Sequence, residues 1–470
     1  MLKGFRPASD NVAAYEICTM KFLVSPCSGI QGRIKVAGDK SISHRAVIFG
    51  AIANGVTRVS GILEGDDVLA TIQAFRAMGI NITRASNQPD DNNYEIQGNG
   101  LHGLSQPASS LDLGNSGTAL RLLTGLLCAQ PWPTTLMGDD SLNQRPMGRI
   151  IDPLMRMGAH IESADGKPPL NITAVEPRTN PLRGIEYATP MASAQVKSAI
   201  LLAGLYAKGR TSVIETATTR DHTERMLEGF GYSVLKIGQK TSRKIGQKIE
   251  HVVTIQSGGE LFAREIEVPA DLSSAAFFIL AALITPKSKL VLQRVGVNPS
   301  RAGVLDVLQR MGGQIELQNQ SDVGGEPVAD IVVRSSKLQG CDVRGNDIAL
   351  AIDEIPVIAV AAACAVGVTR ISDAAELRVK ESDRIHCLVT GLKALGINAK
   401  ENSDGMVIEG GKLTGGQVQS CGDHRIAMAF SIAGAAALDQ VEVLDCNNVA
   451  TSFPNFYPLA NQAGVNIVAH

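Results

Sequence analysis

The chain has 470 residues, of which 44% are hydrophobic and 19% are charged, and its net charge at pH 7 is −2. This length exceeds what one hydrophobic core supports and predicts about two to four domains. The nearly neutral charge gives no reason to expect nucleic acid or an anionic membrane surface as a partner. An anionic ligand must therefore be held by local basic clusters.

Eight cysteines are scattered along the chain without a C-x-x-C pair. Several lie in apolar runs, as buried thiols do, and this pattern predicts a reduced, cytoplasmic protein. The longest apolar stretches, such as 355–368, are shorter than the roughly 18–20 residues of a membrane span. Residues 1–20 lack the apolar segment of a secretory signal; we expect a loose leader there, with Met20 as a candidate functional start.

One short pattern recurs six times along the chain. A helical run is followed by a hydrophobic residue, a glycine and a short apolar strand. A glycine at this point fits the left-handed cap that ends a helix and turns the chain into a strand. These glycines are Gly79, Gly158, Gly231, Gly312, Gly396 and Gly464.

An alanine-rich helical run precedes each of these endings. The six runs begin near Ser41, Thr118, Ser193, Ser273, Asp353 and Asp423. Strands rich in β-branched residues follow them, as at 56–59 and 368–371, and less cleanly at 133–137. A helix that is apolar on nearly all sides must be covered by other elements.

Each unit therefore reads as strand, buried helix, strand, second helix and strand. Six such units predict two similar α/β domains of three units each, because the repeat is too long for the common solenoids. The break between the domains is expected near 269–271, after the Lys/Gln/Gly-rich stretch 236–249.

Cationic side chains gather where these helices begin. Carboxylates at a helix start are explained as caps, whereas the helix dipole disfavours lysine and arginine there. Such cations predict a cleft that binds two phosphate- or carboxylate-bearing ligands. They are Lys40, Arg45, Arg121 and Arg425 at buried helices, and Arg145, Arg220, Arg378 and Arg384 at second helices.

Each motif has a simpler interpretation when it is taken alone. Lys40-Ser41 lacks the spacing of a phosphate-binding P-loop, and 115–118 can be a capped turn. Ser193 and Gln195 can form only a helix cap, and isolated Asp–Arg pairs are commonly surface ion pairs. The eight histidines show no metal-ligand spacing, so neither a metal nor a cofactor is expected. These motifs recur at matching positions of the repeat units, and this recurrence favours one shared cleft.

Five segments in this order resemble the motifs of the 5-enolpyruvylshikimate-3-phosphate synthase family of enolpyruvyl transferases. They are 38–45, 113–119, 145–148, 378–384 and 423–425. The resemblance extends from about residue 25 to the C-terminus, and 191–199 and 451–454 resemble the class II branch. Thr451 stands where many class I members have a lysine, so the role of that lysine is not carried over.

The resemblance implies an α/β fold of two inside-out domains, each of three βαβαββ units around buried alanine-rich helices (an EPT/RTPC-like fold). Residues 21–39 plus 268–470 would form the first lobe and 40–267 the second, with the active site in the cleft between them. The implied activity transfers the enolpyruvyl group of phosphoenolpyruvate to the 5-hydroxyl of shikimate 3-phosphate and releases phosphate. This is a step toward chorismate and the aromatic amino acids, and it is expected of a monomer with no macromolecular partner.

The resemblance also assigns site residues. Those for shikimate 3-phosphate are Lys40, Ser41, Arg45, Ser193, Gln195, Arg220, Asp353 and Lys380. Those for phosphoenolpyruvate are Lys40, Gly117, Arg145, Gln195, Arg384 and Arg425. Asp353, assisted by Lys380, is expected to take the hydroxyl proton, and Glu381, with Lys40, to exchange protons at the methylene carbon. Gly117 predicts sensitivity to the family inhibitor glyphosate, since some tolerant class II members have alanine there.

Two alternatives remain at this point. The sister enzyme that uses UDP-N-acetylglucosamine shares the fold, but it typically carries a cysteine in a mobile loop, and 114–121 has none. A non-catalytic phosphometabolite-binding protein of the same fold is disfavoured because Asp353, Glu381, Lys380 and Lys40 are all present.

Overall fold

The computed structural model describes residues 20–86, 92–176, 179–215, 217–241 and 248–470. Most of the expected leader and the middle of the Lys/Gln/Gly-rich stretch lie outside these ranges. Within them, no helix combines the length and the apolar character that crossing a membrane requires.

Every alanine-rich run predicted from the sequence is a buried helix. These helices are α1 (Lys40–Ile52), α3 (Gly117–Leu127), α5 (Ala194–Gly204), α7 (Leu272–Ile284), α10 (Ile355–Ala363) and α12 (His424–Ala435). Small residues let them pack closely. A side chain at Gly125 of α3, for example, would collide with the carbonyl of Ala199 on α5.

The second helix of each unit ends as the sequence predicts. These helices are α2 (Asp66–Ala77), α4 (Gly148–Arg156), α6 (His222–Gly229), α8 (Gly303–Arg310), α11 (Arg384–Ala394) and α13 (Phe456–Ala463). All six recurring glycines have a positive φ, between 80° and 102°. Glycine adopts this conformation without the penalty that other residues incur, which explains its recurrence at the turn into the following strand.

The described strands form six four-stranded sheets, one for each unit. Three sheets, in strand order, are β14 (Glu265–Glu267), β3 (Asn54–Ser60), β5 (Tyr94–Asn99), β4 (Asn81–Arg84); β6 (Leu111–Asp112), β7 (Thr134–Met137), β9 (Lys167–Ile172), β8 (Ile161–Ala164); and β10 (Glu186–Ala188), β11 (Arg210–Glu215), β13 (Lys248–Gln256), β12 (Val234–Thr241).

The other three sheets have the same design. They are β16 (Gln314–Val323), β17 (Glu326–Arg334), β15 (Lys289–Gly296), β2 (Gln31–Ile34); β18 (Asp342–Val343), β19 (Val368–Ile371), β21 (Gly405–Glu409), β20 (Asn398–Asn402); and β22 (Gly416–Gln419), β23 (Val441–Leu444), β1 (Phe22–Ser25), β24 (Asn466–Ala469). Each sheet contains one parallel pair, and the remaining pairs are antiparallel.

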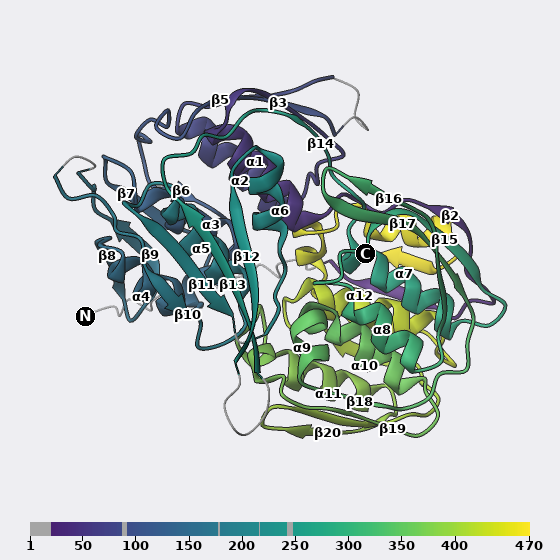
Figure 1. The fold of residues 1–470 in the computed structure, drawn as a ribbon. Helices are drawn as coiled ribbons and strands as arrows, with labels where there is room; N and C mark the ends of the chain where they lie inside the picture. Colours follow the sequence, from purple (N-terminus) through teal and green to yellow (C-terminus); the bar gives the residue numbers. More distant parts are fainter. Residues whose placement is uncertain (1–19, 87–91, 177–178, 216, 242–247) are drawn as a thin grey trace, which may run out of the picture.

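Two strands are exchanged between the halves of the chain. β2, which precedes α1 in the sequence, pairs with β15 of the C-terminal half, whereas β14, which precedes α7, pairs with β3 of the N-terminal half. β1 also joins the C-terminal half, where it completes the sheet of the sixth unit between β23 and β24. The chain therefore crosses twice between the two lobes seen in Figure 1.

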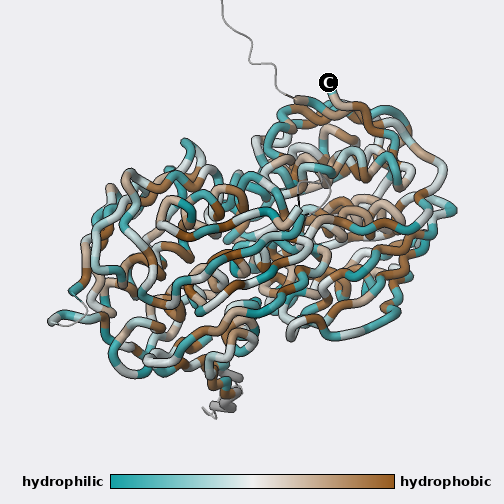
Figure 2. The backbone as a smooth tube through the Cα atoms, turned by 90° about the horizontal axis from the view of Figure 1, so that it is seen from above, coloured by the Kyte–Doolittle hydropathy of each residue, from teal (hydrophilic) through white to brown (hydrophobic). Residues whose placement is uncertain are grey.

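Each lobe has its own hydrophobic core. One core contains Phe22, residues 30–36 and the apolar side chains from Ala270 onward, and the other contains those from Ile42 to Val268. Seen from above, the lobes lie side by side, and hydrophobic and hydrophilic residues alternate along the strands (Figure 2). The predicted fold of two α/β lobes with three repeat units each is confirmed.

The two crossover segments lie against each other. The amide of Asp39 donates to the carbonyl of Pro269 at 2.8 Å, and the amide of Asp271 donates to the carbonyl of Ala37 at 2.9 Å. The guanidinium of Arg301 lies between the two aspartates, 2.6 Å from Asp271 and in contact with Asp39, and all three side chains are buried. One buried cation therefore joins the two points at which the chain changes lobe.

Replacing this cation should destabilise the protein strongly. Arg301→Met leaves two aspartates buried without their counter-ion, so the free energy of unfolding should fall by about 3–5 kcal/mol. Arg58→Met is the matched control, because Arg58 pairs with Glu95 on the exposed face of β3 and should contribute at most about 1 kcal/mol. Urea-induced unfolding of both variants measures the difference. Equal losses would contradict the role given to Arg301.

Candidate active site

A cavity of about 980 Å³ lies between the lobes. All the residues that the resemblance assigned to a site line it, with the exception of Arg384. They are Lys40, Ser41, Arg45, Gly117, Arg145, Ser193, Gln195, Arg220, Asp353, Lys380, Glu381 and Arg425. The structure thus brings together side chains from five of the six repeat units.

Helix N-termini surround the cavity. The side chains of Asp39, Ser116, Ser193 and Asp423 cap α1, α3, α5 and α12 by accepting backbone N–H groups. This agrees with the sequence-based interpretation of these residues as caps. The adjoining helix ends carry partial positive charge, which adds to the field of the cations beside them.

The wall formed by α1, α5 and α6 holds a buried arginine. Arg45 donates from Nε to Thr223 Oγ1 at 2.7 Å and from Nη2 to Ser198 Oγ at 2.8 Å. Burial is the largest influence on its pKa, which falls to about 10. Arg45 therefore stays charged at neutral pH, and it is held by hydroxyl groups.

Asp353 lies opposite, in the turn before α10, and is surrounded by cations. Arg220 Nη2 lies 2.6 Å from its Oδ2, and Lys380 Nζ lies 3.3 Å from its Oδ1. Arg425 donates to its backbone carbonyl at 3.0 Å. Burial alone would raise the pKa of Asp353, but Lys380 and Arg220 hold it well below its usual range.

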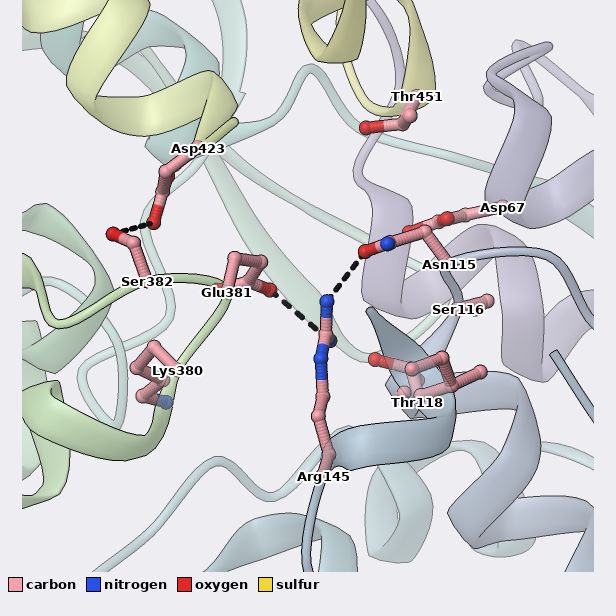
Figure 3. A network of polar contacts seen from close by, with 12 residues as sticks. Asp67, Asn115, Ser116, Thr118, Arg145, Lys380, Glu381, Ser382, Asp423 and Thr451 are labelled. Carbon is pink, nitrogen blue, oxygen red and sulfur yellow. Dashed lines mark hydrogen bonds and ion pairs between the residues drawn. The ribbon is translucent and has the colours of Figure 1, made fainter. Parts of the chain in front are cut away.

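A second carboxylate, Glu381, lies just before α11. Arg384 Nη2 lies 2.6 Å from its Oε2, and Arg145 reaches across from the other lobe to its Oε1 at 3.5 Å. Figure 3 shows Arg145 between Glu381 and Asn115. Burial alone would raise the pKa of Glu381, yet Arg384 and Arg145 hold it well below its usual range.

Arg384 is placed differently from the other assigned residues. Its side chain is 1% exposed, and its Nε donates to Asp423 Oδ2 at 2.7 Å. It reaches the cavity only through the carboxylates of Glu381 and Asp353. Its Nη1 lies 3.6 Å from Asp353 Oδ1 and is buried without a hydrogen-bond partner among the described residues.

Arg121 and Arg301 line the cavity, although the resemblance assigned neither of them. Arg121 donates to Gln195 Oε1 at 2.6 Å, and Gln195 donates to Thr118 Oγ1 at 2.9 Å. The signal for Arg121 was present in the sequence, because it is a cation in the first turn of a buried helix. Arg301 gave no such signal, since its partners are far away along the chain.

His424 also lines the cavity. Burial, with the charge of Lys40 nearby, lowers its pKa to about 3, so the imidazole is neutral. Within the described residues its Nε2 is buried without a hydrogen-bond partner. The sequence motif included this histidine but gave it no role.

The arrangement suits chemistry on small anions. Lysine and arginine groups converge with helix N-termini on one cavity, and two ionised carboxylates lie where they can accept protons. Lys40 Nζ, 2.9 Å from Asp67 Oδ2, adds an ammonium group at the start of α1. In the described ranges no three His, Cys, Asp or Glu side chains are grouped as metal ligands, and the seven cysteines there are free thiols.

Known proteins resemble the chain over nearly its whole length. The family model described as EPSP synthase (3-phosphoshikimate 1-carboxyvinyltransferase) matches residues 24–459. The 3-phosphoshikimate 1-carboxyvinyltransferase of Acidithiobacillus ferrooxidans is 54% identical over 445 residues, which cover 95% of this chain and 98% of that protein. The protein of the same name from Nitrosococcus oceani is 52% identical over 450 residues, covering 96% and 97%. A solved EPSP synthase from Acinetobacter baumannii matches with a TM-score of 0.82 and 47% identity, covering 96% of this chain and 100% of that one.

Proposed function

Because the chain belongs to the EPSP synthase (3-phosphoshikimate 1-carboxyvinyltransferase) family, we propose that it transfers the enolpyruvyl group of phosphoenolpyruvate to the 5-hydroxyl of shikimate 3-phosphate. Phosphate is the second product. The observation that carries this proposal is the placement of the family's site residues around a single cavity.

Shikimate 3-phosphate is assigned to the side of the cavity near α1, α5 and the start of α6. Arg45 and Ser41 from α1, Ser193 and Gln195 at the start of α5, and Arg220 all line this region. Charge-assisted hydrogen bonds contribute about 1.5–3 kcal/mol each, so several together can hold a small anion. Lys40 at the start of α1 belongs to the same side, and Asp353 and Lys380 complete the proposed set from the facing lobe.

Phosphoenolpyruvate is assigned to the region between α3 and α11. Arg145 and Arg425 line it directly, with Lys40, Gln195 and Gly117 beside them. Arg384 belongs to the same proposed set, and its Nη1, which has no hydrogen-bond partner among the described residues, is free to donate to the ligand. Arginine suits both the carboxylate and the phosphate of this ligand, because its fork donates two parallel hydrogen bonds.

Three proton transfers are assigned to the two carboxylates. Asp353, paired with Lys380, takes the proton of the 5-hydroxyl as that oxygen attacks. Ionised Glu381 takes up a proton, for which the ammonium group of Lys40 is the proposed source, and delivers it to the methylene carbon. It removes one proton from that carbon when the adduct loses phosphate. The residues assigned to the chemistry are therefore Asp353, Glu381 and Lys40, and no step calls for a metal or a cofactor.

The finer organisation is part of the same proposal. We take 21–39 plus 268–470 as one lobe and 40–267 as the other, because the two hydrophobic cores change over close to these points, between Val36 and Ile42 and between Val268 and Ala270. The enzyme is proposed to act as a cytoplasmic monomer without nucleic-acid or membrane partners. Transfer to UDP-N-acetylglucosamine is not favoured, because the relatives are named for the shikimate reaction and 114–121 contains no cysteine.

Phosphate release from phosphoenolpyruvate tests the function directly. Release should depend on shikimate 3-phosphate and be absent with UDP-N-acetylglucosamine under the same conditions. Release only with the nucleotide sugar would assign the sister reaction. Tight binding of shikimate 3-phosphate without any turnover would make the chain a binding protein of this fold.

The division of the proton transfers has its own test. Glu381→Gln should abolish the incorporation of deuterium from solvent at the methylene carbon of phosphoenolpyruvate, because an amide neither donates nor accepts that proton. Glu376→Gln is the matched control, since Glu376 lies on the same rim and pairs with Arg149. Mass spectrometry measures the exchange, and calorimetry verifies that both substrates still bind. Unchanged exchange in Glu381→Gln would refute the assignment.

Gly117 should control inhibition by glyphosate, which is expected to occupy the phosphoenolpyruvate site. An added Cβ would lie 2.9 Å from Arg121 Nη1 and 3.2 Å from Arg145 Nη1, so both guanidinium groups must shift. Gly117→Ala should raise the inhibition constant by about tenfold or more, which corresponds to roughly 1.4 kcal/mol. Gly148→Ala is the control, because nothing lies within 4 Å of its added Cβ. If the natural enzyme is already insensitive to glyphosate, the role given to Gly117 is refuted.

A further inference from the structure

Lys197 follows Gln195 by two residues on α5, yet its side chain turns away from the cavity into the protein. Its Nζ lies 2.9 Å from Glu215 Oε2 and 2.7 Å from Glu224 Oε1. The side chains of Lys197, Glu215 and Glu224 are 1%, 3% and 1% exposed. Apolar residues of similar volume would fill such a core at least as well as buried charges, so stability alone does not explain this triad.

One branch of the triad leads to Arg220. Glu215 is the last residue of β11, and its second carboxylate oxygen accepts a hydrogen bond from Thr219. Thr219 immediately precedes Arg220, whose guanidinium lies 2.6 Å from Asp353 across the cavity. Lys197 therefore orients the carboxylate that holds the side chain of Thr219, the residue before Arg220.

The other branch leads to Arg45. Glu224 follows Thr223 on α6, and Thr223 Oγ1 receives the Nε–H of Arg45 at 2.7 Å. Ser198, the neighbour of Lys197, receives Nη2 of the same arginine at 2.8 Å. After burial, the charge of Glu224 has the largest influence on the pKa of Arg45 and opposes its fall. The cluster therefore contains two buried cations, Lys197 and Arg45, and two buried carboxylates, Glu215 and Glu224, whose charges offset each other.

We infer that Lys197 is a positioning residue for the acceptor substrate, an inference that rests on the proposed function. It joins α5, the end of β11 and α6. The start of α5 carries Ser193 and Gln195, Arg220 lies between β11 and α6, and α5 and α6 together hold Arg45 of α1. Among the described residues its partners are Glu215 and Glu224, whereas Arg145, Arg384 and Arg425, which are assigned to phosphoenolpyruvate, pair with Glu381, Asp423 and Glu354. Loss of Lys197 should therefore weaken the binding of shikimate 3-phosphate selectively.

Steady-state kinetics of Lys197→Met test this inference. KM for shikimate 3-phosphate should rise by about tenfold or more, while KM for phosphoenolpyruvate stays within about twofold. Leu201→Ala is the matched control, because Leu201 is fully buried on the same helix and does not line the cavity. It should lower Tm without changing either KM. A lower Tm with an unchanged KM for shikimate 3-phosphate in Lys197→Met, or equal rises in both KM values, would overturn the inference.

A second variant covers the case in which Lys197→Met does not fold. Glu215→Gln keeps the pair of Lys197 with Glu224 but weakens the branch toward Arg220, so KM for shikimate 3-phosphate should rise severalfold on its own. An unchanged KM in this variant would also overturn the inference. The natural enzyme is assayed first. If the natural enzyme does not use shikimate 3-phosphate, the proposed function is refuted. If it turns over normally and both variants keep its KM for shikimate 3-phosphate, only the role of Lys197 is refuted.

Discussion

The buried contact of Arg301 with Asp39 and Asp271 is the constraint on which the two-lobed site depends. Each lobe supplies only part of the cavity, so the site exists only when the lobes are correctly registered. Asp39 caps α1 directly before Lys40, and Asp271 caps α7. Asp39 and Asp271 thus both cap a helix and bind Arg301. The position of the crossover therefore also fixes the direction of α1 and the place of the Lys40 ammonium group at its start.

The lobes also meet across the cavity through opposite charges. Arg220 lies 2.6 Å from Asp353, Arg145 lies 3.5 Å from Glu381, and Arg149 lies 2.8 Å from Glu376. In each pair the cation belongs to the lobe whose core runs from Ile42 to Val268, and the carboxylate belongs to the other lobe. Cations at helix N-termini need anionic neighbours, and these carboxylates supply them. Anionic substrates that enter the cavity must compete for the same cations.

The sequence predicted the parts of this structure that repeat locally. Six alanine-rich runs became six buried helices, and the recurring glycine adopted the left-handed conformation in every unit. The exchange of β2 and β14 between lobes could not be predicted from the repeat, because pairing between distant strands leaves no local periodicity. Arg301 was missed for the same reason, since it meets Asp39 from 262 positions away.

The side-chain directions within buried helices were equally hidden from the sequence. An amphipathic helix shows which residues face the core, but α5 is apolar on almost every side, so its pattern could not separate Gln195, which lines the cavity, from Lys197, which does not. Arg384 is a similar case, because its motif identified the residue but not the fact that Glu381 and Asp423 enclose it. The family resemblance supplied residue identities, and tertiary packing decided which atoms reach the cavity.

The cations that surround Asp353 and Glu381 impose a condition on the proposed chemistry. A carboxylate whose pKa lies well below its usual range is a weak base, and both carboxylates are in this state when paired with their cations. In the proposed mechanism, the phosphate and carboxylate groups of the substrates bind the same guanidinium and ammonium groups, and each cation drawn toward a ligand would raise the pKa of the carboxylate it leaves. Under this proposal, substrate binding would strengthen the two carboxylates as bases at the step that removes a proton. The cross-cleft ion pairs thus hold the site together without ligands and make its basicity depend on the ligands that replace them.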